Sequence, residues 1–575
     1  MAAETTTVRR RMWSFALSES LRRAALGYHR SIVYRARYAG PSPDRLLIAP
    51  TDLRTSDATL AHDIYGGRFV FAGLAVDASE ESVFAIDPPS EDWARELHGF
   101  GWLRHLRASE LKISRSHART LVRDWIRVGR RHHPIAWEPD IVARRVLSWL
   151  SQSPLVLEEC DHASYRTFIR SLTSQIRSLR RIAPDGPPGL PRLTMMIALS
   201  AAAVALPEQD RFLRQAGRRL EAELKEQILP DGGHVSRNPV ATLEILADLL
   251  PLRQAYAARG LPPPAGMIAA IDRMMPMVRF FRHGDCAFAR FNGAGDTAVD
   301  LVATVLAYDD ARGQPLVSAP YSGFERMAHG DTVAIFDTGR PAPIALSGEA
   351  HAGALSFELS SGSHRIIINC GTGRASGSRL HRLSRTTAAH STVTVNDCSS
   401  CRFLMGSALA RRFGEVIVEG PRMTTVARAD DDDGSSVMIA SHDGYAERFG
   451  LIHERRVKLS SSGHRLDGID RLLPAPGGRL SRGAKDEFAI RFHLHPDVRA
   501  EIGERGHVFL TLGNGEGWEF ATDHDVALEE SLFFSETYGN LWSTQLVVAG
   551  RPQARDTVAW WLQRTGMPTR QSAEA

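Results

Sequence analysis

Cysteine is scarce in this chain, with 5 residues among 575. An odd and small number excludes a disulfide framework of the kind that holds small secreted domains together. Cys398 and Cys401 have the spacing of a redox or metal pair, but no second such pair accompanies them, so a structural interpretation is favoured. Long apolar runs are absent as well, because no stretch approaches the roughly 20 residues that a transmembrane helix needs.

The chain also lacks a large excess of charge of one sign. The 70 Lys and Arg residues oppose 66 Asp and Glu residues, which leaves a net charge of +4. Such a balance gives no indication of a nucleic-acid partner. Residues 1–20 contain no apolar run followed by a small-residue cleavage site, so no signal peptide is indicated. We therefore expect a cytoplasmic location, with the periplasm as the less favoured alternative.

At 575 residues, the chain is too long for one core and predicts several domains. Between residues 110 and 320, apolar residues recur at helical spacing, as in Leu121–Ile126, and Pro/Gly-rich turns separate the stripes. From residue 321 to 565, short period-2 runs such as Leu451–Leu459 alternate with turn residues, which predicts antiparallel strands. These patterns predict an incomplete α/α toroid followed by a large antiparallel β-sandwich.

The two ends of the chain differ from these regions. We expect residues 1–109 to form a basic helix and a capping segment, and residues 566–575 to be a disordered polar tail. Eight arginines fall between residues 9 and 37. Such a helix suits peripheral contact with a membrane surface or an acidic polymer, although a solvated face that packs through Trp13, Leu17 and Leu21 is favoured.

The most informative motif is a histidine placed directly before a strand. His390 precedes a run in which polar Thr392 and Thr394 alternate with valines. About forty residues earlier, His351 precedes a similar run that contains Phe357. A histidine at a strand entrance is held rigidly, and yet it lies at the sheet rim where a ligand can reach it.

These two runs resemble the "H…F" and "AHN-T" strands of the heparinase II/III-like polysaccharide lyases, with His-Ser-Thr here at the second position. The expected order of a helical toroid and a β-sandwich is similar too. The resemblance implies β-elimination on uronic-acid polysaccharides or oligosaccharides. Elimination across C4–C5 of a uronate needs a group that neutralises the C5 carboxylate, a base for the C5 proton and an acid for the leaving oxygen.

Three side chains in the helical half are candidates for this chemistry. Pro230–Gly233 is a strong turn signal, and His234, Arg237 and Asn238 follow it shortly before an expected helix. A helix N-terminus favours anions, and in the family the corresponding loop supplies the group that neutralises the carboxylate. We therefore expect these three residues to hold a uronate carboxylate. A capped loop with solvated side chains is the alternative.

A second candidate is the Gly-rich loop Arg290–Asp296, which suits an anion or sugar, or a turn in which Asp296 caps a helix. The family's catalytic tyrosine would lie in this neighbourhood. This chain has no Tyr between Tyr256 and Tyr308. Unless Tyr256, Tyr308 or Tyr321 substitutes for it, the elimination machinery is incomplete.

The resemblance gives His351 and His390 one of two roles, as acid or base groups near the cleft or as zinc ligands. In heparinase II-like members, a catalytic histidine stands two residues before the first of them, where this chain has Glu349. The family's zinc aspartate corresponds here to Asn369, and a neutral amide is a poor zinc ligand. No cofactor is therefore required, and two hydrogen-bonded histidines at the sheet rim are the alternative to a zinc site.

The sequence thus favours a lyase-like enzyme that cleaves an acidic polysaccharide or oligosaccharide. The alternative is a non-catalytic carbohydrate-binding or cell-envelope assembly protein that kept the fold and lost the tyrosine. A cytoplasmic hydrolase or lyase for small unsaturated sugars is a third option.

Overall fold

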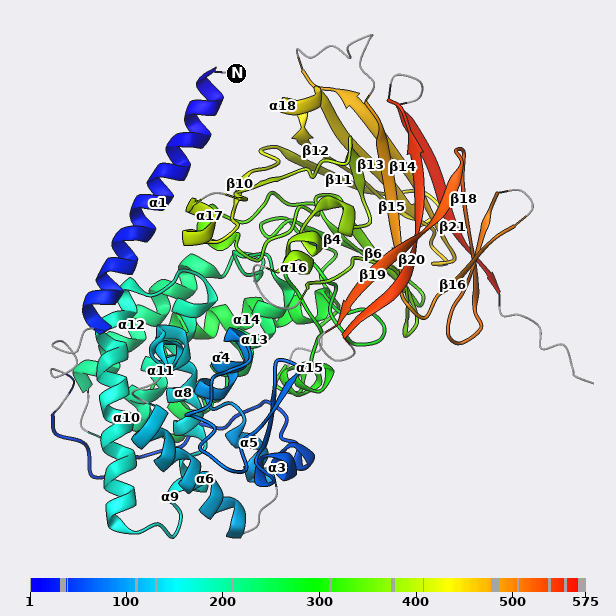
Figure 1. Ribbon diagram of the computed structural model, residues 1–575. Helices are drawn as coiled ribbons and strands as arrows, with labels where there is room; N and C mark the ends of the chain where they lie inside the picture. The colour runs from blue at the N-terminus through cyan, green and yellow to red at the C-terminus, as the bar shows by residue number, and fades with distance from the viewer. Residues whose placement is uncertain are drawn as a thin grey trace, which may run out of the picture.

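Helices make up the first half of the chain and strands the second (Figure 1). The computed structural model describes residues 2–30, 38, 40–108, 112–129, 133–207, 210–309, 313–373, 378–406, 408–476, 486–503, 506–535, 539–552 and 556–566. The expected tail beyond residue 566 lies outside the described residues. The helical half comprises α1 (Ala2–Arg30), α3 (Ala58–Tyr65), α4 (Glu91–Gly99), α5 (Leu103–Ala108), α6 (Lys112–Asp124), α8 (Pro139–Ser151), α9 (Ser153–Leu157), α10 (His162–Ile182), α11 (Leu190–Ala205), α12 (Asp210–Gln227), α13 (Pro239–Ala258), α14 (Ala265–Phe280) and α15 (Val299–Leu306).

The core of the helical half surrounds α11. Nearly all of this helix is apolar, and every residue from Leu193 to Ala205 is buried. A helix that is apolar on all sides requires neighbours on all sides, and α8, α12 and α13 pack against it. A small hairpin of β1 (Arg68–Phe71) and β2 (Leu74–Asp77) interrupts the helices near the start of the chain.

Helix α1 lies outside the helical bundle and extends toward the strand half (Figure 1). It packs through Phe15, Ala16 and Leu26, and Phe15 meets the ring of Phe413 edge-on. The expectation that it packs through Trp13, Leu17 and Leu21 is wrong, because these side chains are 61%, 63% and 64% exposed. The apolar stripe of the helix therefore points away from the protein.

Two antiparallel sheets face each other in the second half. Within the described residues, one has the order β11 (Thr424–Asp430), β12 (Ser436–Tyr445), β13 (Leu451–Leu459), β14 (Arg465–Pro474), β21 (Thr557–Gly566), β18 (Gly517–Thr522), β17 (Val508–Thr511) and β16 (Arg499–Ile502). The other has the order β19 (Val526–Ser535), β20 (Gly539–Gly550), β15 (Phe488–Leu494), β7 (His364–Ile368), β6 (Phe357–Ser361), β5 (Thr332–Asp337), β4 (Phe324–His329) and β3 (Ser318–Ala319), while β8 (Val393–Val395) pairs with β15.

The inward faces of these sheets form the second core. Alternate residues of β13 are buried, as its period-2 pattern predicts. The remaining elements of this half are short: α16 (Arg379–Ser384), α17 (Ala408–Phe413), α18 (Ala446–Phe449), β9 (Arg402–Phe403) and β10 (Ile417–Glu419). The predicted fold class, a helical toroid followed by an antiparallel β-sandwich, is confirmed.

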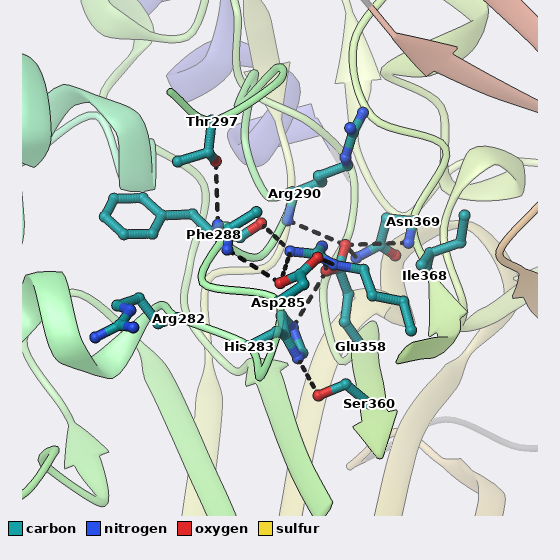
Figure 2. Close-up of polar contacts among 12 residues, drawn as sticks. Arg282, His283, Asp285, Phe288, Arg290, Thr297, Glu358, Ser360, Ile368 and Asn369 are labelled. Atoms are coloured by element: carbon teal, nitrogen blue, oxygen red, sulfur yellow. Dashed lines mark hydrogen bonds and ion pairs between the residues drawn. The ribbon is translucent and has the colours of Figure 1, made fainter. Parts of the chain in front are cut away.

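A buried charge cluster joins the two halves (Figure 2). Glu358 on β6 accepts a hydrogen bond from Arg365 at 3.1 Å, and the same guanidinium donates to Asp285 at 2.8 Å in the loop after α14. His283 lies 3.4 Å from Glu358 and bonds to Ser360. Burial alone would raise the pKa of the Glu358 carboxyl, but His283 and Arg365 keep it below its ordinary value. The charges are compensated, so the cluster fixes the relative position of the halves.

Candidate functional site

The loop that precedes α13 is held by its own turn and by the strand half. Gly232 has a φ of +90°, and a Cβ there would lie 1.8 Å from the carbonyl oxygen of Arg273. Only glycine fits such a position. Asp231 accepts hydrogen bonds from the backbone and side chain of Ser322, at 2.7 and 3.1 Å. The turn read from the sequence therefore docks the helical half onto the beginning of the sandwich.

His234 is buried, and both of its ring nitrogens have partners. Nδ1 lies 2.7 Å from the Ser236 hydroxyl and Nε2 lies 2.8 Å from the Gln227 side-chain oxygen. Burial lowers the pKa of His234 from its ordinary value of 6.5 to about 4. The ring is therefore neutral at pH 7, and residues of the helical half engage both of its nitrogens.

Arg237 is 8% exposed, and its guanidinium is fully engaged. It donates to the carbonyl oxygens of Ser322, Gly323 and Arg340, at 2.7, 3.0 and 3.0 Å, and pairs with the Asp337 carboxylate. The backbone of Gly339 makes room for the group, since a Cβ there would lie 2.4 Å from it. The arginine thus ties the loop before α13 to the sheet and to the end of β5.

Asn238 is the N-cap of α13. Its side-chain oxygen accepts from the backbone of Val240 at 2.9 Å, and Pro239 occupies the first helical position, where its missing N–H costs nothing. Its amide nitrogen faces Gly293, where an added Cβ would lie 3.5 Å from it and 3.0 Å from the Cβ of Glu349. Asn238, Gly293 and Glu349 therefore lie together at the junction of the two halves.

His351 and His390 are in direct contact, with 3.0 Å between Nδ1 of His351 and Nε2 of His390. The other nitrogen of His390 donates to the Thr386 carbonyl at 2.7 Å, so Nε2 of His390 is the acceptor of the pair. Burial lowers the pKa of His390 to about 4 and that of His351 well below its ordinary value. Both rings are neutral, and Nε2 of His351 is buried without a hydrogen-bond partner.

A continuous set of hydrogen bonds connects these histidines with Arg237. Asp337 pairs with Arg237 and accepts from the Asn292 amide at 3.1 Å, and the Asn292 oxygen accepts from the His351 backbone at 3.3 Å. The structure thus brings Arg237, His351 and His390 into one network. The His234 side chain bonds to Gln227 and Ser236 instead, and His234 meets this network through its backbone, whose carbonyl oxygen accepts from the Arg237 N–H at 2.8 Å.

The arrangement does not fit a zinc ion on these side chains. His390 uses both nitrogens, and Asn369 is held by Glu358 and by the backbone of Ser391, at 3.3 and 3.1 Å. Only Nε2 of His351 has a free lone pair, whereas a structural zinc needs four ligands. Among the described residues, no three His, Cys, Asp or Glu side chains gather in a way that would hold a metal ion.

A cleft of about 1460 Å³ opens beside this network, between α1, the loop before α13 and the edge of the sandwich. Tyr321 lines it and is 66% exposed. Tyr256 is buried in the helical core against Ser200, and Tyr308 packs partly against the same core. Of these three tyrosines, Tyr321 is the one that a ligand in this cleft can touch.

Several residues at the site were not anticipated from the sequence. Asp337 connects the network to Asn292, which lies in the candidate loop Arg290–Asp296, and Glu349 lies 3.6 Å from the buried His381 on α16. Asp337 is the last residue of β5, so the sequence does show a carboxylate at a strand end. Its partner is 100 residues distant in the chain, which no local pattern reveals.

The chain belongs to the heparinase II/III-like family. A family model described as "Heparinase II/III-like, C-terminal" matches residues 311–562. The chain is 32% identical over 565 residues to FtsZ-localized protein C of Caulobacter vibrioides (strain NA1000 / CB15N), covering 96% of each sequence.

Solved structures show the same fold. The crystal structure of heparinase III is similar with a TM-score of 0.71 and 14% identity, over 98% of this chain and 92% of that one. The heparan sulfate lyase HepC from Pedobacter heparinus is similar with a TM-score of 0.55 and 16% identity, over 95% of this chain and 88% of that one. In the described part of the chain, no helix combines the length and the apolar character needed to cross a bilayer.

Proposed function

We propose that this chain is a non-catalytic member of its family that takes part in cell-envelope assembly where FtsZ is located, in the cytoplasm. The observation that carries the proposal is the commitment of Arg237 to Asp337 and to three carbonyl oxygens. The arginine that the resemblance assigns to the substrate carboxylate is therefore not free to neutralise it, and elimination also needs a base that reaches C5. The similarity to a relative whose name states that it is localized with FtsZ supports the assembly role.

The other expected site residues support the same proposal. His234 and His390 use both ring nitrogens within the fold, and Asn238 caps a helix. The rings are neutral at pH 7 because their pKa values are lowered by burial. Such side chains hold their own loops and helix ends in place, and a protein that binds rather than cleaves requires this too.

The exposed face of α1 adds a peripheral membrane contact to the proposal. Trp13, Leu17 and Leu21 form an apolar stripe, and the exposed Arg10 and Arg23 accompany it. Aromatic and aliphatic residues beside arginines are typical of helices that lie in the interface of an anionic bilayer. Contact of this kind would hold the protein at the envelope without a membrane-spanning segment.

Elimination on an acidic, uronic-acid-containing polysaccharide or oligosaccharide is the second candidate. The specific observation in its favour is Tyr321, which is exposed in the cleft. It offers the same phenol group as the family tyrosine, from a different position in the chain. In this case Tyr321 would be the group that exchanges a proton with the sugar, and the cleft arginine Arg340 would face its carboxylate.

The two candidates are separated by one pair of assays. Wild type and Tyr321→Phe are incubated with heparan sulfate, alginate and chondroitin, with heparinase III as the positive control, and unsaturated uronate is followed by absorbance. We expect no product from either protein. We also expect wild type to co-sediment with FtsZ polymers. Product that wild type forms and Tyr321→Phe does not would replace the assembly proposal with the lyase.

A further inference from the structure

The cleft beside α1 carries positive charge that the protein does not neutralise. Among its acidic residues, Glu325 pairs with Arg428 at 2.8 Å and Glu419 with Arg402 at 2.9 Å. Arg237 and Arg422, which also line it, have carboxylate partners.

The two remaining cleft arginines are Arg11 on α1 and Arg340 after β5. The described residues offer neither of them a carboxylate within ion-pair distance, and Arg340 makes a single long contact to a carbonyl, at 3.4 Å. Arg11 and Arg340 belong to different halves of the protein and line the same cleft. An anionic ligand that enters there satisfies both.

One wall of the cleft is an open sheet edge. Strand β11 pairs with β12 on one side only, and it stands at the end of its sheet. Met423, Thr424 and Val426 line the cleft, and most of β11 is exposed. Within the described residues, no element pairs with the second edge of Thr424–Asp430.

This edge carries only part of the usual protection against strand pairing. Natural edge strands are shortened, or carry Lys or Pro, or are covered. Strand β11 spans seven residues and contains neither Lys nor Pro. Its Arg428 is turned inward to Glu325 and to two carbonyl oxygens, which is one such device, but the exposed residues Thr425, Val426 and Ala427 carry no charge. Exposed Val426 and Met423 give an incoming strand apolar surface to cover.

We propose that the cleft binds an extended acidic peptide of a partner protein, which adds to β11 as a further strand. Backbone hydrogen bonds to the open edge provide affinity, and alternate side chains enter the cleft, as in other cases of strand addition. Acidic side chains of the peptide contact Arg11 and Arg340, and apolar ones cover Val426 and Met423. The inference rests on the proposed assembly function, for which it names the class of partner.

The probe is a fluorescent ten-residue peptide in which Glu alternates with Val. A second peptide has Lys in place of each Glu. Two further peptides carry N-methyl groups on the odd or on the even residues of the acidic probe, which removes the donors along one edge or the other. Heparin-derived decasaccharide is the glycan probe. All are titrated into the full-length protein and followed by fluorescence anisotropy or competition.

The variant is Arg11→Ala/Arg340→Ala. Its matched control is Arg10→Ala/Arg499→Ala, which removes two exposed arginines outside the cleft, one on α1 and one on the opposite edge strand β16. Circular dichroism and thermal unfolding show whether both variants fold. Because all four arginines are at the surface, we expect both to unfold like wild type, within the usual range for surface substitutions.

We expect the acidic peptide to bind and the Lys peptide not to bind. The cleft variant should weaken binding about tenfold, as the loss of two charge-assisted contacts implies, and the control should not. One methylated peptide should lose binding and the other keep it, because only one edge of an added strand faces β11. Equal effects of the two methylations, absence of acidic-peptide binding, or tighter binding of the decasaccharide would overturn the inference.

Failure of this inference is distinguishable from failure of the assembly proposal. If the peptide does not bind but wild type co-sediments with FtsZ, the strand-addition site is wrong and the assembly function stands. If the peptide binds as described but wild type forms unsaturated uronate, the site stands and the non-catalytic function is wrong.

Discussion

Replacement of Arg237 by alanine tests whether this residue serves the fold or a ligand. The change removes four contacts between the loop before α13 and the sheet, and it leaves the Asp337 carboxylate buried with only amide partners. Breaking one side of a buried ion pair costs about 3–5 kcal/mol. We therefore expect the free energy of unfolding to fall by about that amount.

The assay is urea unfolding followed by tryptophan fluorescence and circular dichroism. Arg340→Ala is the matched control. The side chain of this neighbouring arginine is exposed in the cleft, and Arg237 bonds only to its backbone carbonyl oxygen, which the substitution keeps. An exposed side chain of this kind should change stability by less than about 0.5 kcal/mol. Arg237→Lys should recover only part of the loss, since an ammonium cannot satisfy three carbonyls and a carboxylate in a fixed fork.

The reasoning is refuted if Arg237→Ala unfolds like wild type. A variant of normal stability that loses binding of acidic glycans would mean that the guanidinium leaves Asp337 to meet a ligand. In that case the role expected from the sequence, neutralisation of a uronate carboxylate, would replace the structural one.

Three further outcomes are expected. Overnight chelation should leave the thermal midpoint unchanged, and elemental analysis should find no stoichiometric zinc; one zinc per chain would contradict our view of the His351–His390 pair. The pKa of His390 is about 4 in the folded protein, against its ordinary value of 6.5. Between about pH 4 and pH 6.5 the unfolded chain therefore binds a proton at this residue more readily than the folded protein does. The stability contributed by the neutral ring should be complete above pH 6.5 and decrease as pH falls to about 4; a urea midpoint independent of pH would count against it. Trp13→Ser/Leu17→Ser/Leu21→Ser should abolish sedimentation with anionic vesicles while secondary structure is kept, whereas equal binding by this variant would exclude α1 as the contact.

Patterns with a short period predicted the fold well. The period-2 run Leu451–Leu459 became β13 with the same bounds. The alternation itself shows which face of the strand is buried. The alternation after His390 likewise predicted a strand, observed as Val393–Val395.

The site was less accessible to such reasoning, since its contacts join residues far apart in the chain. Arg237 and Asp337 are 100 positions apart, and His351 and His390 are 39 apart, so the sequence could not show that each satisfies the other. Asn238 followed by Pro239 was a readable capping signal. The packing of the apolar stripe on α1 was predicted wrongly, because helical spacing shows that a face is apolar but does not show what covers it.

Helix α1 presents Arg11 to the cleft and Trp13 to the outside, and it touches both halves of the protein. A ligand that fixes the position of α1 from the cleft side therefore changes the free energy with which the outer face of the helix binds a surface. By thermodynamic linkage this effect is reciprocal. Partner binding in the cleft and attachment to a surface would then be cooperative, with a single helix as the element that both stabilise.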